Sequence, residues 1–170
     1  MMLRQLLRPN WLRECTLAEL PLQELLSQPI RALVLDVDRT LLPRRQAELP
    51  DSALRWLQQA RQQVPIHLFS NNPSRQRIGT VAARLDLPYT ISAGKPRRSA
   101  LRRVLAELNL PHQEVALIGD RLFTDVIAGN RLGLFTVLVK PIDPQGHPCK
   151  RDRLQKLELR LANWVGTSLG

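Results

Sequence analysis

The stretch RALVLDVDRT at residues 31–40 places a short apolar run directly before two aspartates. The run from Ala32 to Asp36 is too short for a typical helix and ends in polar residues, which favours a buried strand. Asp36 and Asp38 stand two positions apart, so in an extended backbone both side chains point to the same side, with α-carbons about 6.6 Å apart. The stretch therefore predicts a strand that delivers two carboxylates to its carboxyl end.

Four further apolar runs alternate with helical patterns along the chain. This alternation is typical of strand-helix-strand units and of a parallel sheet. We expect five strands in all, at residues 32–36, 66–70, 89–92, 115–119 and 134–139.

The segments between the strands carry apolar residues at steps of three and four, which indicates helices that cover the sheet. One helix is expected after a cap at Asp51, and a second after Asn72 as its cap. A short helix is expected from near Thr124 to Gly133. An amphipathic tail helix, basic on its far side, has an apolar side that comprises Leu154, Leu157, Leu161, Trp164 and Val165.

Composition indicates one globular domain. The chain has 170 residues, of which 44% are hydrophobic, and a chain of this length buries roughly 70% of its unfolded surface in one core. We expect a single domain over 1–170, with its core at about 30–142 and with an N-terminal segment (1–29) and a C-terminal helix (150–166) packed on it. Cys15 and Cys149 lack the paired spacing of a zinc or redox site, which favours a reduced, cytoplasmic setting.

The formal net charge of +10 predicts attraction to anionic partners, which include phosphorylated substrates, nucleic acid and acidic lipid surfaces. The N-terminal segment has no apolar stretch long enough for a signal peptide or a membrane span. A helical face with Leu3, Leu6, Leu7 and Trp11 could lie on a membrane surface or pack on the core. The sequence leaves both alternatives open.

Polar residues follow the predicted strands at the edge where open parallel sheets bind ligands. Ser70 ends the second strand, Lys95 follows the third, and Asp120 ends the fourth. A divalent ion between Asp36 and Asp120 would keep Asp36 ionised while Asp38 stays protonated. Oxygen ligands favour magnesium, and a lysine and a hydroxyl would neutralise and orient phosphoryl oxygens. This set meets the needs of phosphoryl transfer.

Four motifs match the haloacid dehalogenase (HAD) superfamily in its order: DVDRT at 36–40, HLFSNN at 67–72, GKP at 94–96 and GDRLFTDVIAGNRLGL at 119–134. The chain resembles the phosphatases of this superfamily, and more narrowly their YqeG-like class IIIA branch, which is related to phosphatidylglycerophosphate phosphatases. The resemblance implies an α/β fold, a HAD-like Rossmannoid three-layer sandwich with a parallel five-stranded sheet. Arg39 departs from the asparagine that is usual in the branch, which puts local hydrogen bonding in doubt.

By position, the resemblance implies that Asp36 is the nucleophile, that Asp38 is the general acid and base, and that Lys95 stabilises the nucleophile and the phosphate. Asp38 would give the metal its backbone carbonyl, and Asp125 would act through a bound water or by positioning Lys95. The implied phosphate-binding residues are Thr40, Ser70, Asn71 and Lys95, and the implied magnesium site consists of Asp36, Asp38, Asp120 and Asp125.

The segments that could hold a cap domain are little more than one helix each, so we expect a capless protein. An open cleft suits a large substrate or one that a surface presents, because that surface supplies the missing enclosure. Together with the charge and the resemblance, this favours phosphatidylglycerophosphate as the substrate, with the protein cytoplasmic and in peripheral contact with an anionic membrane.

Three alternatives remain. One is hydrolysis of another phosphomonoester, on a protein, a nucleic acid or a soluble metabolite. A receiver-type phosphoacceptor domain is disfavoured by the order of the acidic residues along the chain. A nucleic-acid-binding module is disfavoured by the scarcity of aromatic residues for base stacking.

Overall fold

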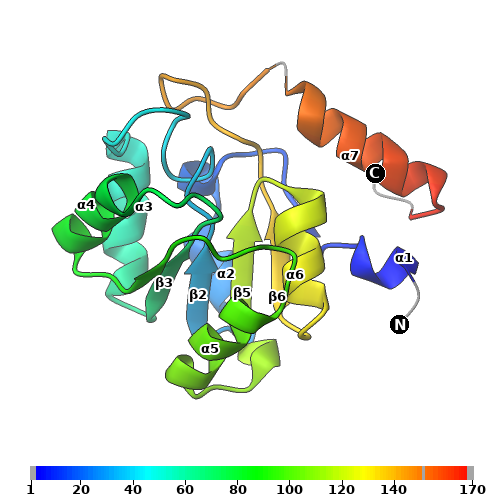
Figure 1. Ribbon diagram of the computed structural model, residues 1–170, viewed down its shortest axis with the longest axis horizontal. Coiled ribbons are helices and arrows are strands. Elements are labelled where there is room, and N and C mark those ends of the chain that lie inside the picture. The colour runs from blue at the N-terminus through cyan, green and yellow to red at the C-terminus, as the bar shows by residue number, and fades with distance from the viewer. Residues whose placement is uncertain (1–2, 151, 168–170) are drawn as a thin grey trace.

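The computed structural model describes residues 3–150 and 152–167 (Figure 1). Its centre is a fully parallel sheet with the order β1-β6-β5-β2-β3-β4. The strands are β1 (Trp11–Leu12), β2 (Ala32–Leu35), β3 (Ile66–Phe69), β4 (Tyr89–Thr90), β5 (Val115–Gly119) and β6 (Phe135–Leu138).

The sheet has one strand more than the sequence predicts. The additional strand is β1, which pairs with β6 through Trp11 and Val137 at one edge. Two residues are too few to produce an alternating pattern in the sequence, so the five-stranded prediction was incomplete. The other five strands lie where they were expected, and differ from the predicted bounds only at their ends.

The strand order decides where the polar residues meet. The central strand β2 lies between β5 and β3, with Leu35 paired to Ile118 on one side and to Leu68 on the other. Residues that directly follow these three strands therefore leave the sheet side by side. This register predicts that Asp36, Ser70 and Asp120 share one rim.

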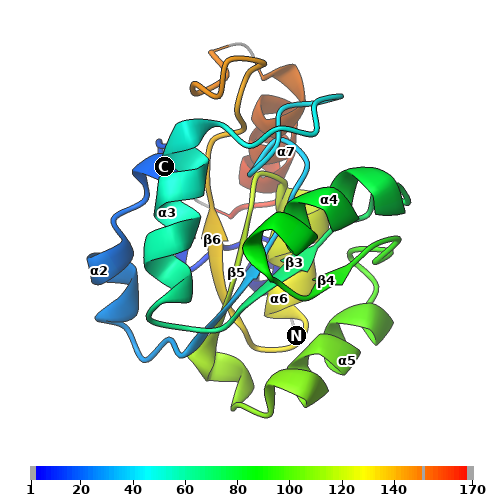
Figure 2. The ribbon, with the colours of Figure 1, turned by 90° about the vertical axis from the view of Figure 1, so that its left-hand side faces the viewer.

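Helices cover both faces of the sheet and produce three layers. Figure 2 shows α2 and α3 on one side and α5 and α6 on the other. One buried cluster joins Leu33 and Leu35 to α3, and a second joins Val34 to Leu101 on α5. The elements outside the sheet are α1 (Leu3–Leu6), η1 (Leu17–Glu19), α2 (Leu22–Leu26), α3 (Asp51–Arg61), α4 (Arg75–Leu85), α5 (Ser99–Leu108), η2 (His112–Glu114), the π-helical turn η3 (Leu122–Val126), α6 (Ile127–Asn130) and α7 (Arg153–Trp164).

Helix α3 follows Pro50 and has Asp51 as its first residue, so Asp51 is not its cap as predicted. Two further helix starts differ from the prediction. Helix α4 is capped by Ser74, whose Oγ accepts from the backbone N of Arg77 at 3.2 Å, and not by Asn72. Asn72 donates its side-chain amide to Asp38 instead. The helix expected from Thr124 begins earlier, at Leu122, as a π-helical turn. Both differences place side chains toward the site.

The N-terminal segment packs on the core through Leu7 and Trp11, two of the residues that left two alternatives open, whereas Leu3 is exposed. Leu7 is buried, and the ring of Trp11 contacts Phe135 edge-on at 5.5 Å. Asn130 donates its amide to backbone carbonyls of this segment, including that of Leu6 at 2.9 Å. Within the described residues, no helix combines the length and the apolar character that crossing a bilayer requires.

The tail helix α7 presents the opposite face from the one predicted. Its buried residues are Gln155, Glu158 and Ala162, whereas its leucine side faces solvent. The prediction assumed that the more apolar side of an amphipathic helix packs inward. It was wrong because buried backbone groups at the ends of β5 and β6 need polar partners, which α7 supplies.

Candidate active site

Asp36 is held at the end of β2 by its own loop. Its backbone N donates to the carbonyl of Ile118 on β5 at 2.9 Å. The hydroxyl of Thr40 donates to its Oδ2 at 3.0 Å, while Arg39 takes a positive φ of 66° that lets the loop turn back. The carboxylate is consequently fixed in place and only slightly exposed.

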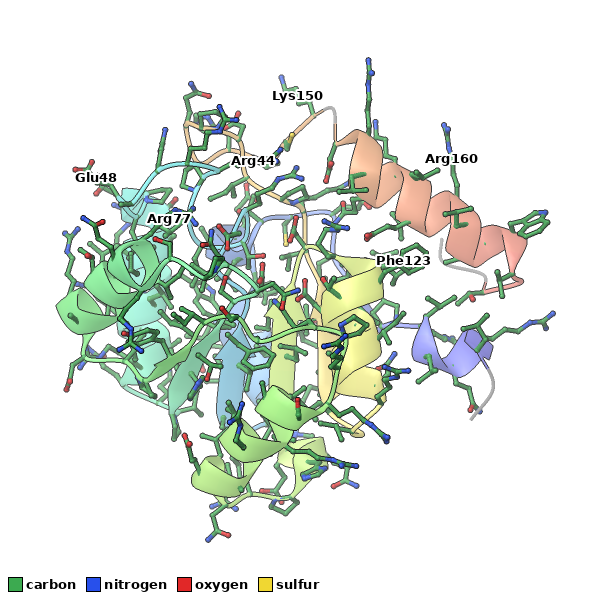
Figure 3. All side chains as sticks on the ribbon, viewed as in Figure 1. Arg44, Glu48, Arg77, Phe123, Lys150 and Arg160 are labelled. Atoms are coloured by element: carbon green, nitrogen blue, oxygen red, sulfur yellow. The ribbon has the colours of Figure 1, made fainter. Side chains whose placement is uncertain are left out.

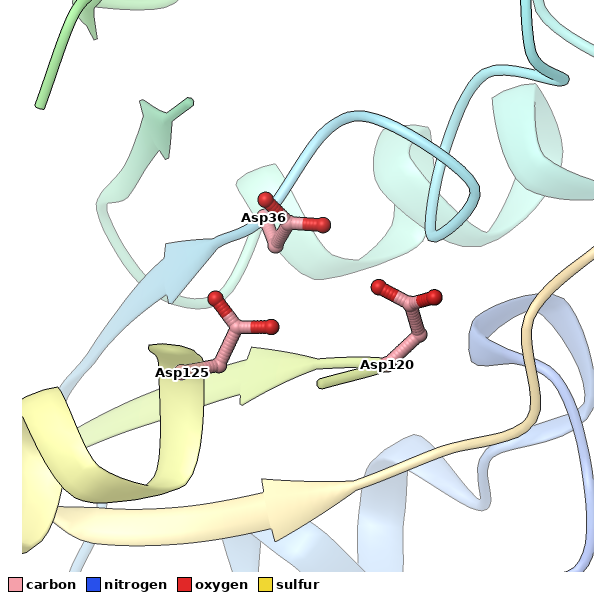
Figure 4. A group of neighbouring side chains, drawn as sticks. All are labelled: Asp36, Asp120 and Asp125. Carbon is pink, nitrogen blue, oxygen red and sulfur yellow. The ribbon is translucent and has the colours of Figure 1, made fainter. Parts of the chain in front are cut away.

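Asp120 and Asp125 complete a group of three buried carboxylates with Asp36 (Figure 4). Each contributes one oxygen, and these oxygens all lie within 4.8 Å of one another. Asp120 follows β5 directly, and Asp125 comes from the π-helical turn η3. Among the described residues, nothing donates a hydrogen bond to Asp120 Oδ2 although it is buried.

Gly119 makes room for this arrangement. A Cβ at position 119 would lie 2.3 Å from Asp125 Oδ2, closer than any real contact. Glycine at this position therefore lets the Asp125 carboxylate lie against the end of β5.

Lys95 lies between two of the carboxylates. Its Nζ is 2.5 Å from Asp36 Oδ1 and 2.7 Å from Asp125 Oδ1, and it also donates to the carbonyl of Phe69 at 3.1 Å. Asn71 holds the Lys95 loop through two hydrogen bonds, since its Oδ1 accepts from Lys95 N at 2.7 Å and its Nδ2 donates to Lys95 O at 3.2 Å. A lysine so buried is stable as a cation only because both carboxylates face it.

The charges of the site perturb one another. Burial raises the pKa of Asp36 to about 6, although the Lys95 ammonium opposes this change. Burial, together with the charges of Asp36 and Asp125, raises the pKa of Asp120 well above its ordinary value. Burial alone would lower the pKa of Lys95, but the carboxylates of Asp125 and Asp36 raise it. The free site therefore holds more negative charge than its surroundings stabilise.

A divalent cation fits these residues. Three ionised carboxylates and one ammonium leave two negative charges in the buried cluster, which one divalent ion balances. The unpartnered oxygen of Asp120 faces the same space. An all-oxygen donor set suits Mg²⁺ or another hard cation. Asp36, Asp120 and Asp125 are the side chains that would hold it.

Asp38 lies beside this cluster with its side chain turned to other partners. Its Oδ2 accepts from the Ser70 hydroxyl at 2.8 Å, and its Oδ1 accepts from Asn72 Nδ2 at 3.2 Å and from the guanidinium of Arg77. Ser70 thus donates to Asp38 and accepts from the backbone N of Asn72.

The three carboxylates, Asp38 and Lys95 line one cavity of about 430 Å³ at the carboxyl edge of the sheet. Figure 3 shows Arg44 and Arg77 above the strand ends. Arg39, Arg77 and Arg121 also line the cavity and are paired with Asp152, Asp38 and Glu158 respectively. Within the described residues, Arg44 and Arg45 line the cavity without any side-chain partner, so two guanidinium groups remain available at its mouth.

Sequence reasoning did not find three of the residues that support the site. Arg77 binds Asp38, and it also donates to the carbonyls of Pro43 and Gln46, which ties the loop after β2 to α4. Gln155 and Glu158 support the Asp120 segment from α7. One signal for Arg77 was present, because it falls in the first turn of the helix that directly follows the HLFSNN motif.

A family model described as HAD-hydrolase-like matches residues 92–141, the segment that contains Lys95, Asp120 and Asp125. The fold agrees. A 2-haloacid dehalogenase from Pseudomonas syringae superposes with a TM-score of 0.52 at 13% identity, over 79% of this chain and 99% of that chain. A protein from Legionella pneumophila, titled a HAD hydrolase of subfamily III A, gives 0.51 at 17% identity, over 86% and 90%. The family model and the shared fold both agree with the HAD superfamily that the motifs predicted.

Within that class, two curated proteins are similar in sequence. "Probable phosphatase YqeG" of Bacillus subtilis is 28% identical over 121 residues, which are 71% of this chain and 70% of the relative. The phosphatidylglycerophosphate phosphatase 1 of Arabidopsis thaliana is 42% identical over 57 residues, 33% of this chain and 16% of that protein. These similarities agree with the predicted YqeG-like, phosphatase-type branch.

Proposed function

We propose that this protein is a phosphatase that hydrolyses phosphomonoesters through a phosphate ester on Asp36, with Mg²⁺ bound beside it. One observation carries the proposal: Asp36 is buried at the floor of an arginine-lined cavity, with Lys95 at 2.5 Å and the unpartnered oxygen of Asp120 in the same carboxylate cluster. Structural carboxylates would instead be satisfied by nearby donors.

In the first half of the reaction, an oxygen of Asp36 forms a bond to phosphorus while the bond from phosphorus to the ester oxygen breaks. The leaving alcohol takes a proton from Asp38. Lys95 holds Asp36 in position and offsets charge on the phosphoryl oxygens, which suits a transition state stabilised mainly by positioning and electrostatics. Three donors, from Ser70, Asn72 and Arg77, hold the Asp38 carboxyl in place for this transfer.

In the second half, Asp38 takes a proton from a water molecule whose oxygen attacks phosphorus. Inorganic phosphate leaves, Asp36 is restored as a carboxylate, and Asp38 is protonated again. When bound, Mg²⁺ would neutralise the approaching phosphate and keep Asp36 ionised. Asp36, Asp120 and Asp125 would hold it through side chains, and Asp38 through its backbone carbonyl. Thr40 braces Asp36, and Ser70 and Asn71 would orient the phosphate.

For the substrate we infer a phosphorylated lipid head group of the phosphatidylglycerophosphate type, met at the membrane surface by a cytoplasmic protein. Three observations support this. The cavity is open. The segment between β2 and β3 holds little more than α3, and the segment between β3 and Lys95 holds little more than α4. Arg44 and Arg45 are available for a second anionic group. The Arabidopsis relative carries the corresponding name.

A phosphate-release screen tests the proposal. The full chain is assayed with and without Mg²⁺ on phosphatidylglycerophosphate in mixed micelles, on soluble sugar and nucleoside monophosphates, and on a phosphopeptide. Asp36→Asn should lower turnover by several orders of magnitude because the nucleophile is lost. Asp51→Asn, an exposed carboxylate at the start of α3, is the matched control and should retain full activity. Equal rates for Asp36→Asn and the parent chain would refute the mechanism.

A further inference from the structure

Helix α7 carries an apolar stripe that nothing in the described chain covers. Leu154, Leu157, Leu161 and Trp164 are 40%, 52%, 43% and 87% exposed, and they are four of the five large apolar side chains that the described residues expose. Steps of three, four and three residues place them along one side of the helix. A stripe of this kind is a contact surface for an apolar partner.

Buried hydrogen bonds hold the stripe outward. Glu158 accepts from the backbone N of Leu122 at 2.8 Å and from Arg121 Nε at 2.8 Å, and Gln155 donates to two buried carbonyls. Turning the leucines inward would leave these buried polar groups without hydrogen-bond partners. The free-energy cost of this loss would exceed the gain from burying the leucines. The outward orientation is therefore a fixed property of the fold.

The charges exposed on α7 have one sign. Arg153, Lys156 and Arg160 are exposed, whereas the two acidic residues of this segment, Asp152 and Glu158, are buried and paired. Figure 3 shows Lys150 and Arg160 projecting to the upper side of the molecule, on which Arg44 also lies. A cationic row beside an apolar stripe fits the interface of an anionic bilayer.

The stripe begins at the mouth of the active site. Leu154 lines the cavity that contains Asp36 and Asp120, and it also lines a neighbouring groove with Arg44 and Arg153. Trp164 lies at the other end of the helix. An amphipathic aromatic side chain at the end of such a stripe suits the head-group level of a membrane.

We propose that the stripe of Leu154, Leu157, Leu161 and Trp164 on α7 docks this protein on an anionic lipid bilayer, with the cavity mouth at the head groups. The inference rests on the proposed function for the claim that the head group is the substrate. A second copy of the chain is the less favourable occupant, because pairing two such helices would bring their cationic rows together.

The test measures binding of the full chain to sedimented vesicles. Vesicles of phosphatidylcholine with phosphatidylglycerol at about 4:1 should retain the protein, and pure phosphatidylcholine vesicles should retain at least about tenfold less. The triple variant Leu157→Gln, Leu161→Gln, Trp164→Gln should lose at least about tenfold in partition onto the anionic vesicles. Its thermal midpoint and its rate on soluble p-nitrophenyl phosphate should not change, since the three side chains contact neither core nor cavity.

A charge-matched pair separates the helix from general attraction. Lys156→Gln with Arg160→Gln should weaken binding, whereas Arg102→Gln with Arg103→Gln, exposed on α5, should leave it unchanged. Three outcomes would refute the proposed docking surface. They are an equal loss of vesicle binding in both charge pairs, equal binding of the parent chain to both vesicle types, and a dimer of the parent chain that the triple variant converts to monomer. Hydrolysis without vesicle binding defeats this inference alone, whereas vesicle binding without hydrolysis of any phosphomonoester defeats the proposed function alone.

Discussion

The carbonyl oxygen of Asp120 accepts a hydrogen bond of 2.7 Å from Gln155 Nε2, so a residue of the candidate metal site, directly after β5, is held by a helix from the far end of the sequence. The same amide donates to the carbonyl of Val139 at 2.8 Å. Two strand ends are thereby fixed by one side chain. The tail helix is part of the support of the active site.

Replacing that side chain should weaken both the fold and the site. Gln155→Ala leaves two buried carbonyls without their donor, which we expect to lower the free energy of unfolding by about 1–3 kcal/mol. Mg²⁺ affinity should fall as well, because the Asp120 segment loses its support. Chemical denaturation and isothermal titration with Mg²⁺ measure the two effects. Lys156→Ala, the exposed neighbour on the same helix, should change neither.

Stability should depend on pH in a direction set by the raised pKa values of Asp36 and Asp120. A carboxyl group whose pKa is higher in the folded state stabilises the fold below its unfolded pKa near 4, and that contribution is lost as the pH rises through the folded value of about 6. For Asp36 the loss is at most about 3 kcal/mol.

Mg²⁺ should reverse this loss, because it replaces the protons. The rise in thermal midpoint on adding Mg²⁺ is expected to be larger at pH 7.5 than at pH 5, as measured by differential scanning calorimetry. Asp36→Asn, which removes one of the titrating groups, should reduce the difference. The same rise at both pH values would contradict the assignment of Asp36 to the metal site.

Arg77 should act on turnover through Asp38. Arg77→Ala removes the guanidinium contact to Asp38 and frees the carbonyls of Pro43 and Gln46. We expect kcat to fall about tenfold or more because the acid-base group is misplaced, with a smaller change in KM. Steady-state kinetics on a soluble monoester measures the split. Arg84→Ala, exposed on the same helix, is the control and should behave like the parent chain.

Gly119→Ala should disturb the site directly. The new methyl would collide with Asp125, which cannot retreat because Lys95 and the backbone N of Arg121 hold it. A stability loss of about 1–3 kcal/mol and weaker Mg²⁺ binding are expected. Gly129→Ala offers the comparison, since its methyl would meet the Thr136 side chain at 2.4 Å, outside the carboxylate cluster. That variant should lose stability but bind Mg²⁺ normally.

Arg44 and Arg45 should select substrates that carry a second anionic group. The double change Arg44→Gln, Arg45→Gln is expected to raise KM about tenfold or more for a monoester with a second phosphate, because each lost charge contact weakens binding. KM for p-nitrophenyl phosphate should change little. Arg102→Gln with Arg103→Gln serves as the charge control. A uniform rise in KM for both substrates would contradict a second anion subsite.

The sequence was most informative where strands end. Asp36, Ser70 and Asp120 each close an apolar run, so parallel pairing alone predicts that they meet at one rim. Their detailed contacts were not predictable, because the pattern pointed to Asn72 as the helix cap, whereas Ser74 is the cap and both Ser70 and Asn72 donate to Asp38.

The tail helix was misjudged for a different reason. Its leucines form the apolar side that would ordinarily pack inward. Gln155 and Glu158 face inward instead, because they form hydrogen bonds with backbone groups of Asp120 and Leu122. No local sequence pattern reveals that these backbone groups need partners. Satisfying buried polar groups outweighed the burial of four apolar side chains.

The π-helical turn from Leu122 to Val126 has a genetic consequence. A π-helical turn holds one residue more than the α-helical turn that would span the same height, and Asp125, which accepts from Lys95, lies in this turn. An in-frame deletion of the Phe123 codon would allow an α-helical turn of nearly the same height to form, so that Asp125 and the residues after it would keep their places. The loss of one codon at this turn should therefore disturb the fold less than the same loss inside a regular helix such as α3.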